Sequence, residues 1–339
     1  MEKIIRSICS FSKQIDPVVI KEQEALVQQL EKAGFSIQTQ RFCVSEQSIL
    51  EIDQQFQNSD KGYLFAIGSL NRQQTQSQLE AFLQAQTPIA FNLQLKDEVR
   101  LEDIEVLFQI IQRAPSKTFH FTFSFNNTYN SPYFPASNFG KTGFSIGLQP
   151  TNLAAGCDSL SAWFDNMKQV WLELTDLFKN NTSFLGIDSS IAPLFGGESS
   201  FIHFIQQLSP SFNKACSSPI FTQVSNFIKQ ENPKSIGLCG LMFPCLEDFE
   251  LAKLYEEDAF DIERNIFLSL HSGLGIDTYP IGIDESRERV LEILQLMLAL
   301  SNKYQKPLAA RFVSDGKTKI GQQSNFENQY LKDVIIHAL

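Results

Sequence analysis

The chain has 339 residues, of which 43% are hydrophobic and 19% are charged, a composition typical of a globular protein with a large buried core. Its net charge is −10, and its lysines and arginines occur singly rather than in a basic stripe. We therefore expect neither a nucleic-acid-binding surface nor one that binds anionic membranes. A small molecule or a second copy of the chain are the partners left to consider.

The six cysteines show no C-x-x-C or zinc-site spacing, and we expect no disulfide framework in a chain of this length. The N-terminus has the pattern of a short strand rather than of a signal peptide. No apolar run approaches the roughly 18 residues of a membrane span. The expected compartment is a reducing cytoplasm. The sequence contains no Walker loop, G-x-S-x-G elbow or H-E-x-x-H motif, so the cofactor and the reaction stay unassigned.

Helix-like and strand-like patterns alternate along the first half of the chain. Residues 17–33 have helical periodicity, and Gly34 follows where a helix C-cap is expected. Residues 118–125 alternate strictly, so that one face of a strand is all Phe and His120 lies on the other face. The other expected segments are strands over 3–12, 35–44, 63–68 and 87–95, and helices over 73–85 and 101–113.

The same alternation continues in the second half. Asp315-Gly316 predicts a hairpin between a strand over 307–314 and a partner strand that begins at Lys317. The other expected segments are strands over 143–148, 184–191, 235–243 and 265–271, and helices over 153–180, 197–208, 219–230, 246–257, 285–304 and 328–338. This order predicts a single α/β domain over residues 1–339, with a mainly parallel sheet or barrel and helices outside it.

Ligands of parallel α/β folds bind at the carboxyl ends of the strands, so the residues that follow each strand are the site candidates. Asp188, Ser189 and Ser190 follow one strand, and a glycine-rich turn comes next. These residues could hold an anion on backbone N–H groups, or Asp188 could bind a cation. Alternatively, Asp188 and Ser189 only cap backbone groups in a turn.

The run from His271 to Pro280 gives the second candidate. Gly273 and Gly275 allow a close approach of the backbone or a positive φ, and Asp277 could bind a metal, a hydroxyl or an amine. His271 is placed as an acid or base that titrates near neutral pH. In the alternative interpretation the glycines permit a bend and Asp277 caps a turn.

The run from Gly237 to Cys245 gives a third candidate, with Gly237 and Gly240 as positions that could contact a ligand. Cys239 lies between these two glycines. A thiol nucleophile needs a base or a positive charge beside it, and the local sequence supplies neither. We expect Cys239 to be buried and inert.

Several blocks of the sequence resemble domain-of-unknown-function family 711, also called uncharacterised protein family 0210. The blocks are Ile5–Ile8, Ser131–Ala136, Gly186–Pro193, Gly237–Pro244 and Ser272–Pro280, and they occur in the family's order. The resemblance implies a barrel related to the ten-stranded α/β barrel of the glycyl radical enzymes. The glycyl radical enzymes need a glycine in a C-terminal loop, and residues 330–339 contain no glycine. The resemblance therefore does not imply radical chemistry. The family has no settled activity, so the resemblance supplies no reaction.

Two hypotheses follow. In the first, the protein binds a small molecule or a metal at the strand ends, with Asp188 and Asp277 as ligands and His271 as an acid or base; whether it is an enzyme stays open. The same site is expected to be lined by Ser189, Ser190, Gly237, Gly240, Gly273 and Gly275. In the second, the protein is a non-catalytic barrel that binds a partner or forms oligomers, as an exposed patch of its many Phe side chains would indicate.

Overall fold

The computed structural model describes residues 2–339, which form a mixed α/β fold. Its strands are β1 (Ile4–Ser12), β2 (Ser36–Ile37), β3 (Gln40–Val44), β4 (Leu64–Leu70), β5 (Ile89–Gln94), β6 (Phe121–Phe125), β7 (Gly143–Leu148), β8 (Phe184–Asp188), β9 (Gly275–Pro280) and β10 (Leu308–Val313). Its α-helices are α1 (Pro17–Lys32), α2 (Ile49–Phe56), α3 (Arg72–Gln84), α4 (Leu101–Arg113), α5 (Leu160–Leu177), α6 (Phe201–Leu208), α7 (Phe212–Cys216), α8 (Ile220–Gln230), α9 (Phe249–Glu256), α10 (Ile262–His271) and α11 (Arg287–Tyr304). No helix in this part of the chain is long and apolar enough to cross a bilayer.

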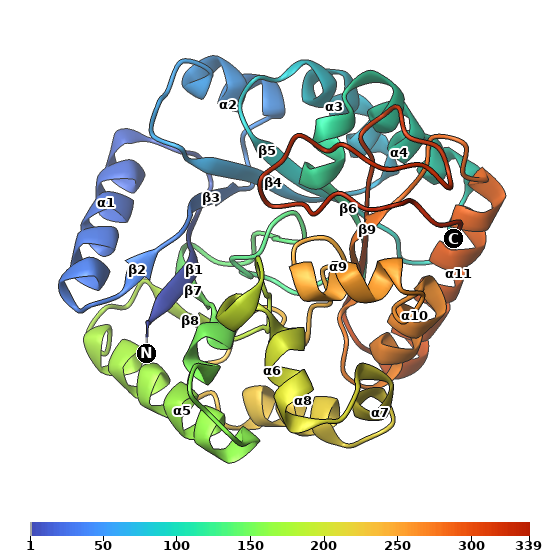
Figure 1. Cartoon of the computed structure of the whole chain (residues 1–339). Helices are drawn as coiled ribbons and strands as arrows, with labels where there is room; N and C mark the ends of the chain where they lie inside the picture. The colour runs from blue at the N-terminus through green and yellow to red at the C-terminus, as the bar shows by residue number, and fades with distance from the viewer. Residues whose placement is uncertain (1) are drawn as a thin grey trace.

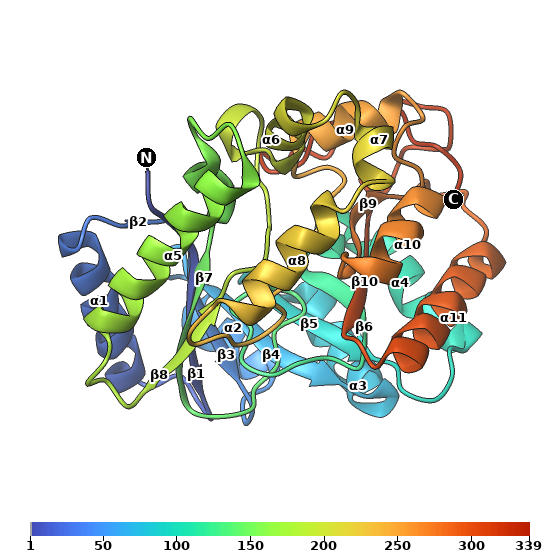
Figure 2. The same ribbon diagram turned by 90° about the horizontal axis from the view of Figure 1, so that it is seen from below.

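The strands form one ten-stranded sheet in the order β8-β7-β1-β3-β4-β5-β6-β10-β9, with β2 paired to β1. Neighbours run parallel within β1–β3–β4–β5–β6, within β7–β8 and within β9–β10. The pairs β1–β7 and β6–β10 are antiparallel. Figure 1 shows the strands near the centre and the helices around them, and Figure 2 shows α5, α8 and α11 in front of the strands.

The strand ladders do not close the sheet, because β8 and β9 are not paired with each other. The segment 235–244 lies between them and makes isolated parallel bridges to both: Ile187 to Ser235, Ile191 to Leu241, Leu241 to Gly273 and Pro244 to Asp277. The strand predicted over 235–243 is therefore a chain of single bridges rather than a regular strand.

The two faces of the sheet carry side chains of different size. Phe65 of β4 and Phe91 of β5 pack against Phe56 of α2 and Phe82 of α3, with ring centroids 4.5 and 4.8 Å apart. The opposite face, called the inner face from here on, carries a small separate cluster of Cys9, Phe11, Cys43, Ala66 and Ala90, in which only Phe11 is large. Large side chains therefore fill the space under the helices, while the small side chains of Cys9, Cys43, Ala66 and Ala90 leave room on the inner face, part of which Phe134 and Phe139 occupy.

The strand predicted over 265–271 is wrong, because these residues belong to α10. Asp261 caps this helix by accepting from the backbone N–H of Arg264. The buried positions, Ile262, Asn265, Leu268 and Ser269, are three to four residues apart, as in a helix. The short apolar run Ile266–Leu268 fits a strand and a helix equally well by periodicity alone.

The hairpin predicted at Asp315-Gly316 and the helix predicted over 328–338 are also wrong. The Asp315 carboxylate instead accepts bonds from Lys317, Thr318 and Asn325, and this holds the chain in an irregular turn. Residues 314–339 cross the face of the molecule as the red loop in Figure 1. Val334 and Ile336 are fully buried and fix this loop to the body of the protein.

Candidate functional site

A cavity lies at the inner face of the sheet. Its volume is about 100 Å³. The ligand that it can hold is therefore small. Its walls contain apolar side chains from many elements, and the titratable side chains among them are Arg6, Arg41, His120, Tyr133, Glu247, Asp277 and Arg311.

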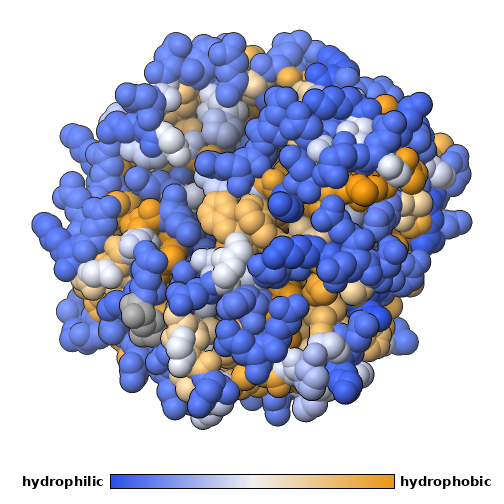
Figure 3. Space-filling view, in the orientation of Figure 1, coloured by the Kyte–Doolittle hydropathy of each residue, from blue (hydrophilic) through white to orange (hydrophobic). Residues whose placement is uncertain are grey.

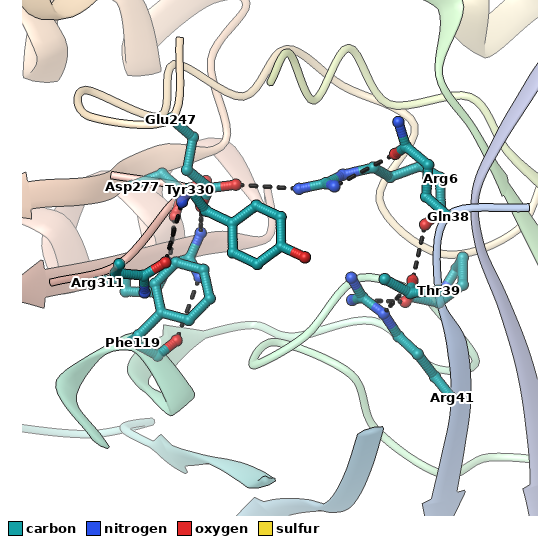
Figure 4. A network of polar contacts seen from close by, with 11 residues as sticks. Arg6, Gln38, Thr39, Arg41, Phe119, Glu247, Asp277, Arg311 and Tyr330 are labelled. Carbon is teal, nitrogen blue, oxygen red and sulfur yellow. Dashed lines mark hydrogen bonds and ion pairs between the residues drawn. The ribbon is translucent and has the colours of Figure 1, made fainter. Parts of the chain in front are cut away.

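Arg311, near the end of β10, holds both carboxylates of the cavity. Its Nε lies 2.6 Å from Asp277 Oδ1 in β9, and its NH2 lies 2.6 Å from Glu247 Oε1. Glu247 Oε2 lies 3.1 Å from NH2 of Arg6 in β1, so one carboxylate joins two arginines. The guanidinium of Arg311 also stands over the Phe119 ring, 5.0 Å from its centroid. Figure 4 shows this chain of ion pairs crossing the cavity.

Arg41 of β3 has no ion-pair partner among residues 2–339, although it is only 7% exposed. Its Nε donates to Thr39 Oγ1 at 3.0 Å and its NH1 donates to the Pro132 carbonyl at 3.2 Å, whereas its NH2 group makes no hydrogen bond within the described chain. Burial, followed by repulsion from Arg6, lowers the pKa of Arg41 to about 10. Arg41 is therefore a buried cation at neutral pH with one side of its guanidinium free.

The cavity carries an excess of positive charge. Three arginines, Arg6, Arg41 and Arg311, face two carboxylates, Glu247 and Asp277. Burial raises the pKa of Glu247, and Arg311 and Arg6 oppose this rise. Protonation of Glu247 would only increase the positive excess.

His120 supplies a neutral imidazole to the cavity. It is the last residue of a 3-10 helix, Pro115–His120, and no hydrogen bond to its ring is present in the described chain. Burial, then Lys117, Arg311 and Arg41, lower the pKa of His120 to about 4. The ring is uncharged at neutral pH and can accept or donate one proton in a hydrogen bond to a ligand.

Asp188 does not line this cavity. It is fully buried, and its two carboxylate oxygens accept five bonds, from Ser131 Oγ, Ser190 N and Oγ, Leu238 N and Cys239 N, at 2.6–3.1 Å. Burial raises the pKa of Asp188, and these bonds act against the rise. Its oxygens already have partners, so in this structure Asp188 joins β8 to the segment 235–244.

The other candidates near Asp188 are placed in the same way. Ser189 Oγ accepts from Trp171 Nε1 at 2.7 Å and from Asn232, and Ser190 Oγ donates to Asp188 at 2.6 Å. A Cβ on Gly237 would lie 2.3 Å from Asp188 Oδ2, and one on Gly240 would lie 2.6 Å from Leu274. The two glycines thus allow segment 235–244 to approach its neighbours closely.

The run from His271 to Pro280 is divided by the structure. Asp277 and Gly275, both in β9, line the cavity. His271 is the last residue of α10, where its Nδ1 lies 2.7 Å from Ser272 Oγ, and it does not line the cavity. Gly273 lies close to the backbone of Leu268 and makes the tight exit from α10. The structure therefore places Asp277 and Gly275 at the cavity and leaves Asp188 and His271 out of it.

Aromatic rings cover one side of the charged cluster. Tyr330, from the loop 314–339, stacks against Phe119 and Phe195, with centroids 6.4 and 6.0 Å away. In Figure 4 the Tyr330 hydroxyl points toward the side on which Arg6 and Arg41 lie. Figure 3 shows the face of the molecule seen in Figure 1, with apolar side chains near its centre and hydrophilic ones around them.

The described residues contain no group of three His, Cys, Asp or Glu side chains arranged to hold a metal ion. All six cysteines are buried and unpaired, as expected for Cys239. Burial, and then Asp188, raise the pKa of the Cys239 thiol to about 12. Cys239 is therefore protonated at neutral pH.

Sequence reasoning missed four members of the charged cluster: Arg6, Arg41, Glu247 and Arg311. The sequence does carry a signal for the three arginines, since each is a single charge in an otherwise mostly apolar strand. An arginine in such a strand must find a partner or a cavity. Glu247 lies in the irregular chain before α9 and gives no such signal.

Fold and site thus define an α/β protein with a charged internal cavity. A family model, "Uncharacterised ACR (DUF711)", matches residues 97–327. The chain belongs to this family, as its sequence blocks predicted. No curated protein matches the chain significantly.

Proposed function

We propose that this protein binds a small molecule in the central cavity, at the charged cluster formed by Arg6, Arg41, Glu247, Asp277 and Arg311. The supporting observation is a buried cation that lacks a counter-charge and borders empty space. Desolvating a charge costs several kcal/mol unless the charge is paired. An unpaired buried Arg41 therefore does not stabilise the fold. A bound molecule supplies the missing partner.

We further infer that the ten strands and segment 235–244 together form a barrel like that of the glycyl radical enzymes. Two observations support this inference. Isolated bridges lie on both sides of the segment, and the pairs β1–β7 and β6–β10 on either side of the parallel strands are antiparallel. In such a barrel the cavity lies at the open end. The six unpaired cysteines agree with a reducing, cytoplasmic compartment.

Native mass spectrometry of gently purified protein, together with thermal unfolding in the presence of small metabolites, tests the binding proposal. The matched variant is Ala309→Leu, because Ala309 lines the cavity and its side chain is only partly covered. The added atoms should fill part of the cavity and abolish both the bound mass and the ligand-dependent rise in unfolding temperature.

Ala25→Leu is the control, because Ala25 is exposed on α1, on the outside of the protein. It should bind as the wild type does. A bound molecule that Ala309→Leu retains in full would overturn the proposal. So would a wild-type protein that takes up no compound from a broad set of anions, cations and neutral molecules.

The structure gives less support to an oligomerising role. Of the 30 phenylalanines in the chain, only Phe195 and Phe267 stand among the exposed large apolar side chains of the described residues. The other exposed ones are spread over α1, α2, α4, α5 and α11, and two more, Tyr129 and Ile335, lie outside the helices. An obligate interface would need them gathered on one face.

A further inference from the structure

We infer that the molecule bound in the cavity is a small monocarboxylate whose carboxylate is held by Arg41. The inference rests on the proposed function, because it names the chemical class that the cavity takes. It is carried by a juxtaposition: a buried arginine with a free NH2 group, a net excess of one positive charge, and apolar walls around a small space.

The charge balance selects a monoanion. Arg311 and Arg6 are held by Glu247 and Asp277, which leaves one guanidinium charge without a partner. One bound negative charge makes the cluster neutral. A dianion such as a phosphate ester would leave a buried negative charge, which is costly in a low-dielectric interior.

The hydrogen bonds of Arg41 leave one donor group free for an anion. The Nε and NH1 groups of Arg41 are fixed by Thr39 and Pro132, so the guanidinium plane is set before any ligand arrives. Its NH2 group stays free for a charge-assisted bond to a carboxylate oxygen. His120, whose ring has no bond partner in the described chain, stands ready for a polar group elsewhere on the ligand.

The surrounding surface selects an apolar body of limited size. The Phe134 ring lies under the Arg41 guanidinium, 5.0 Å from ring centroid to Cζ. Ala90, Leu274 and Ile276 add apolar surface to the cavity wall. The cavity volume, about 100 Å³, suits a short aliphatic or a single-ring acid better than a nucleotide or a peptide.

The test is a calorimetric titration of the whole protein with propionate, butyrate and benzoate, with propionamide as the uncharged match and inorganic phosphate as the rival anion. We expect at least one carboxylate to bind and propionamide and phosphate not to bind. Arg41→Met should weaken that binding by about 10- to 100-fold, the usual effect of losing a charge-assisted hydrogen bond.

Arg41→Met should still fold, because both groups that accept hydrogen bonds from Arg41 keep another hydrogen bond. The Pro132 carbonyl keeps its bond from Ser7 Oγ at 2.9 Å, and the Thr39 hydroxyl keeps donating to the Arg6 carbonyl at 2.7 Å. Arg41→Lys is the second variant: it retains the charge and should lose less affinity than Arg41→Met. Arg113→Met, at an exposed pair with Glu80, is the control and should not change the affinity.

Equal affinity of the wild type and Arg41→Met for the carboxylate would overturn the inference. Stronger binding of phosphate than of any carboxylate, or equal binding of propionamide, would also overturn it. The proposed function fails separately. If a neutral or cationic molecule occupies the cavity and is lost in Ala309→Leu, the cavity binds small molecules and only the carboxylate inference is wrong.

Discussion

Asp188 and Arg41 are both buried charged residues, but they differ in how many partners their charged groups have. Asp188 accepts five hydrogen bonds from side chains and backbone N–H groups. Arg41 has two hydrogen bonds, no counter-charge and a cavity beside it. A saturated buried charge acts as structure, whereas an unsaturated one beside empty space indicates a binding site. Both residues are polar exceptions in apolar strands, and the sequence could not tell which was which.

Asp188→Asn should destabilise the protein by about 1–3 kcal/mol, because the Asn amide presents a donor to groups that are themselves donors. Urea unfolding of the two proteins measures this difference. The matched control is Asp176→Asn, since Asp176 is 74% exposed in its side chain and should change stability by less than about 0.5 kcal/mol. An Asp188→Asn protein as stable as the control would show that the five bonds are not needed.

His120 should make the protein sensitive to acid. Its pKa in the folded protein, about 4, lies below the ordinary 6.5, so the unfolded chain binds the proton first as the pH falls. The stability contributed by neutral His120 is therefore complete above pH 6.5 and is lost down to about pH 4. The loss amounts to at most about 3 kcal/mol.

The measurement is the change in unfolding free energy between pH 7 and pH 4.5 for the wild type and for His120→Gln. The variant cannot take up this proton and should lose less stability than the wild type. Equal losses in the two proteins would show that His120 is not held in its neutral form.

At the scale of elements, periodicity predicted most helices well and failed at short apolar runs. Helices such as α1, α4 and α11 are long, so their periodic pattern is unambiguous. Residues 265–271 are too short for such a distinction, and they belong to a helix whose N-terminus Asp261 caps. The loop 314–339 keeps its shape through tertiary contacts, which no local pattern announces.

Gly275 is predicted to be essential for joining β9 to β10. Its φ is +115°, and a Cβ there would lie 2.0 Å from the Ala309 carbonyl oxygen. We expect Gly275→Ala to cost about 2–4 kcal/mol in unfolding free energy, because both the backbone and the neighbouring strand must shift.

Gly156→Ala is the control that separates the two causes. Gly156 also has a positive φ, +74°, but nothing lies within 4 Å of a Cβ placed there. Its cost should be only the backbone term, about 1 kcal/mol. Equal costs at the two positions would mean that the contact with Ala309 does not matter.

At the scale of the whole molecule, alternating strands and helices predicted an α/β fold in one chain of elements, but not the order of the sheet. The order places β7 beside β1 and β10 beside β6, both antiparallel, and these pairings join segments that are far apart in sequence. They also bring Arg6, Arg41 and Arg311 around one cavity. A site made of single residues from distant strands leaves no local motif, so the sequence alone does not predict it.

If segment 235–244 joins the two edges of the sheet in solution, the amides that bond it to its neighbours should resist hydrogen exchange. The Met242 N–H donates to the Ile191 carbonyl and the Leu274 N–H donates to the Leu241 carbonyl, both at 2.9 Å. We expect protection close to that of the Ile8 amide between β1 and β3. Exchange as fast as at the exposed Gly62 turn would contradict a joined sheet.

The proposed specificity for a carboxylate depends on Arg41 binding the acid group of a small molecule in the cavity. A crystal structure of the protein grown with a carboxylate that binds in the titration tests it most directly. We expect a carboxylate oxygen about 3 Å from the free NH2 group of Arg41, with the body of the ligand against Phe134. A ligand bound elsewhere on the protein, or one in the cavity whose carboxylate faces away from Arg41, would contradict it.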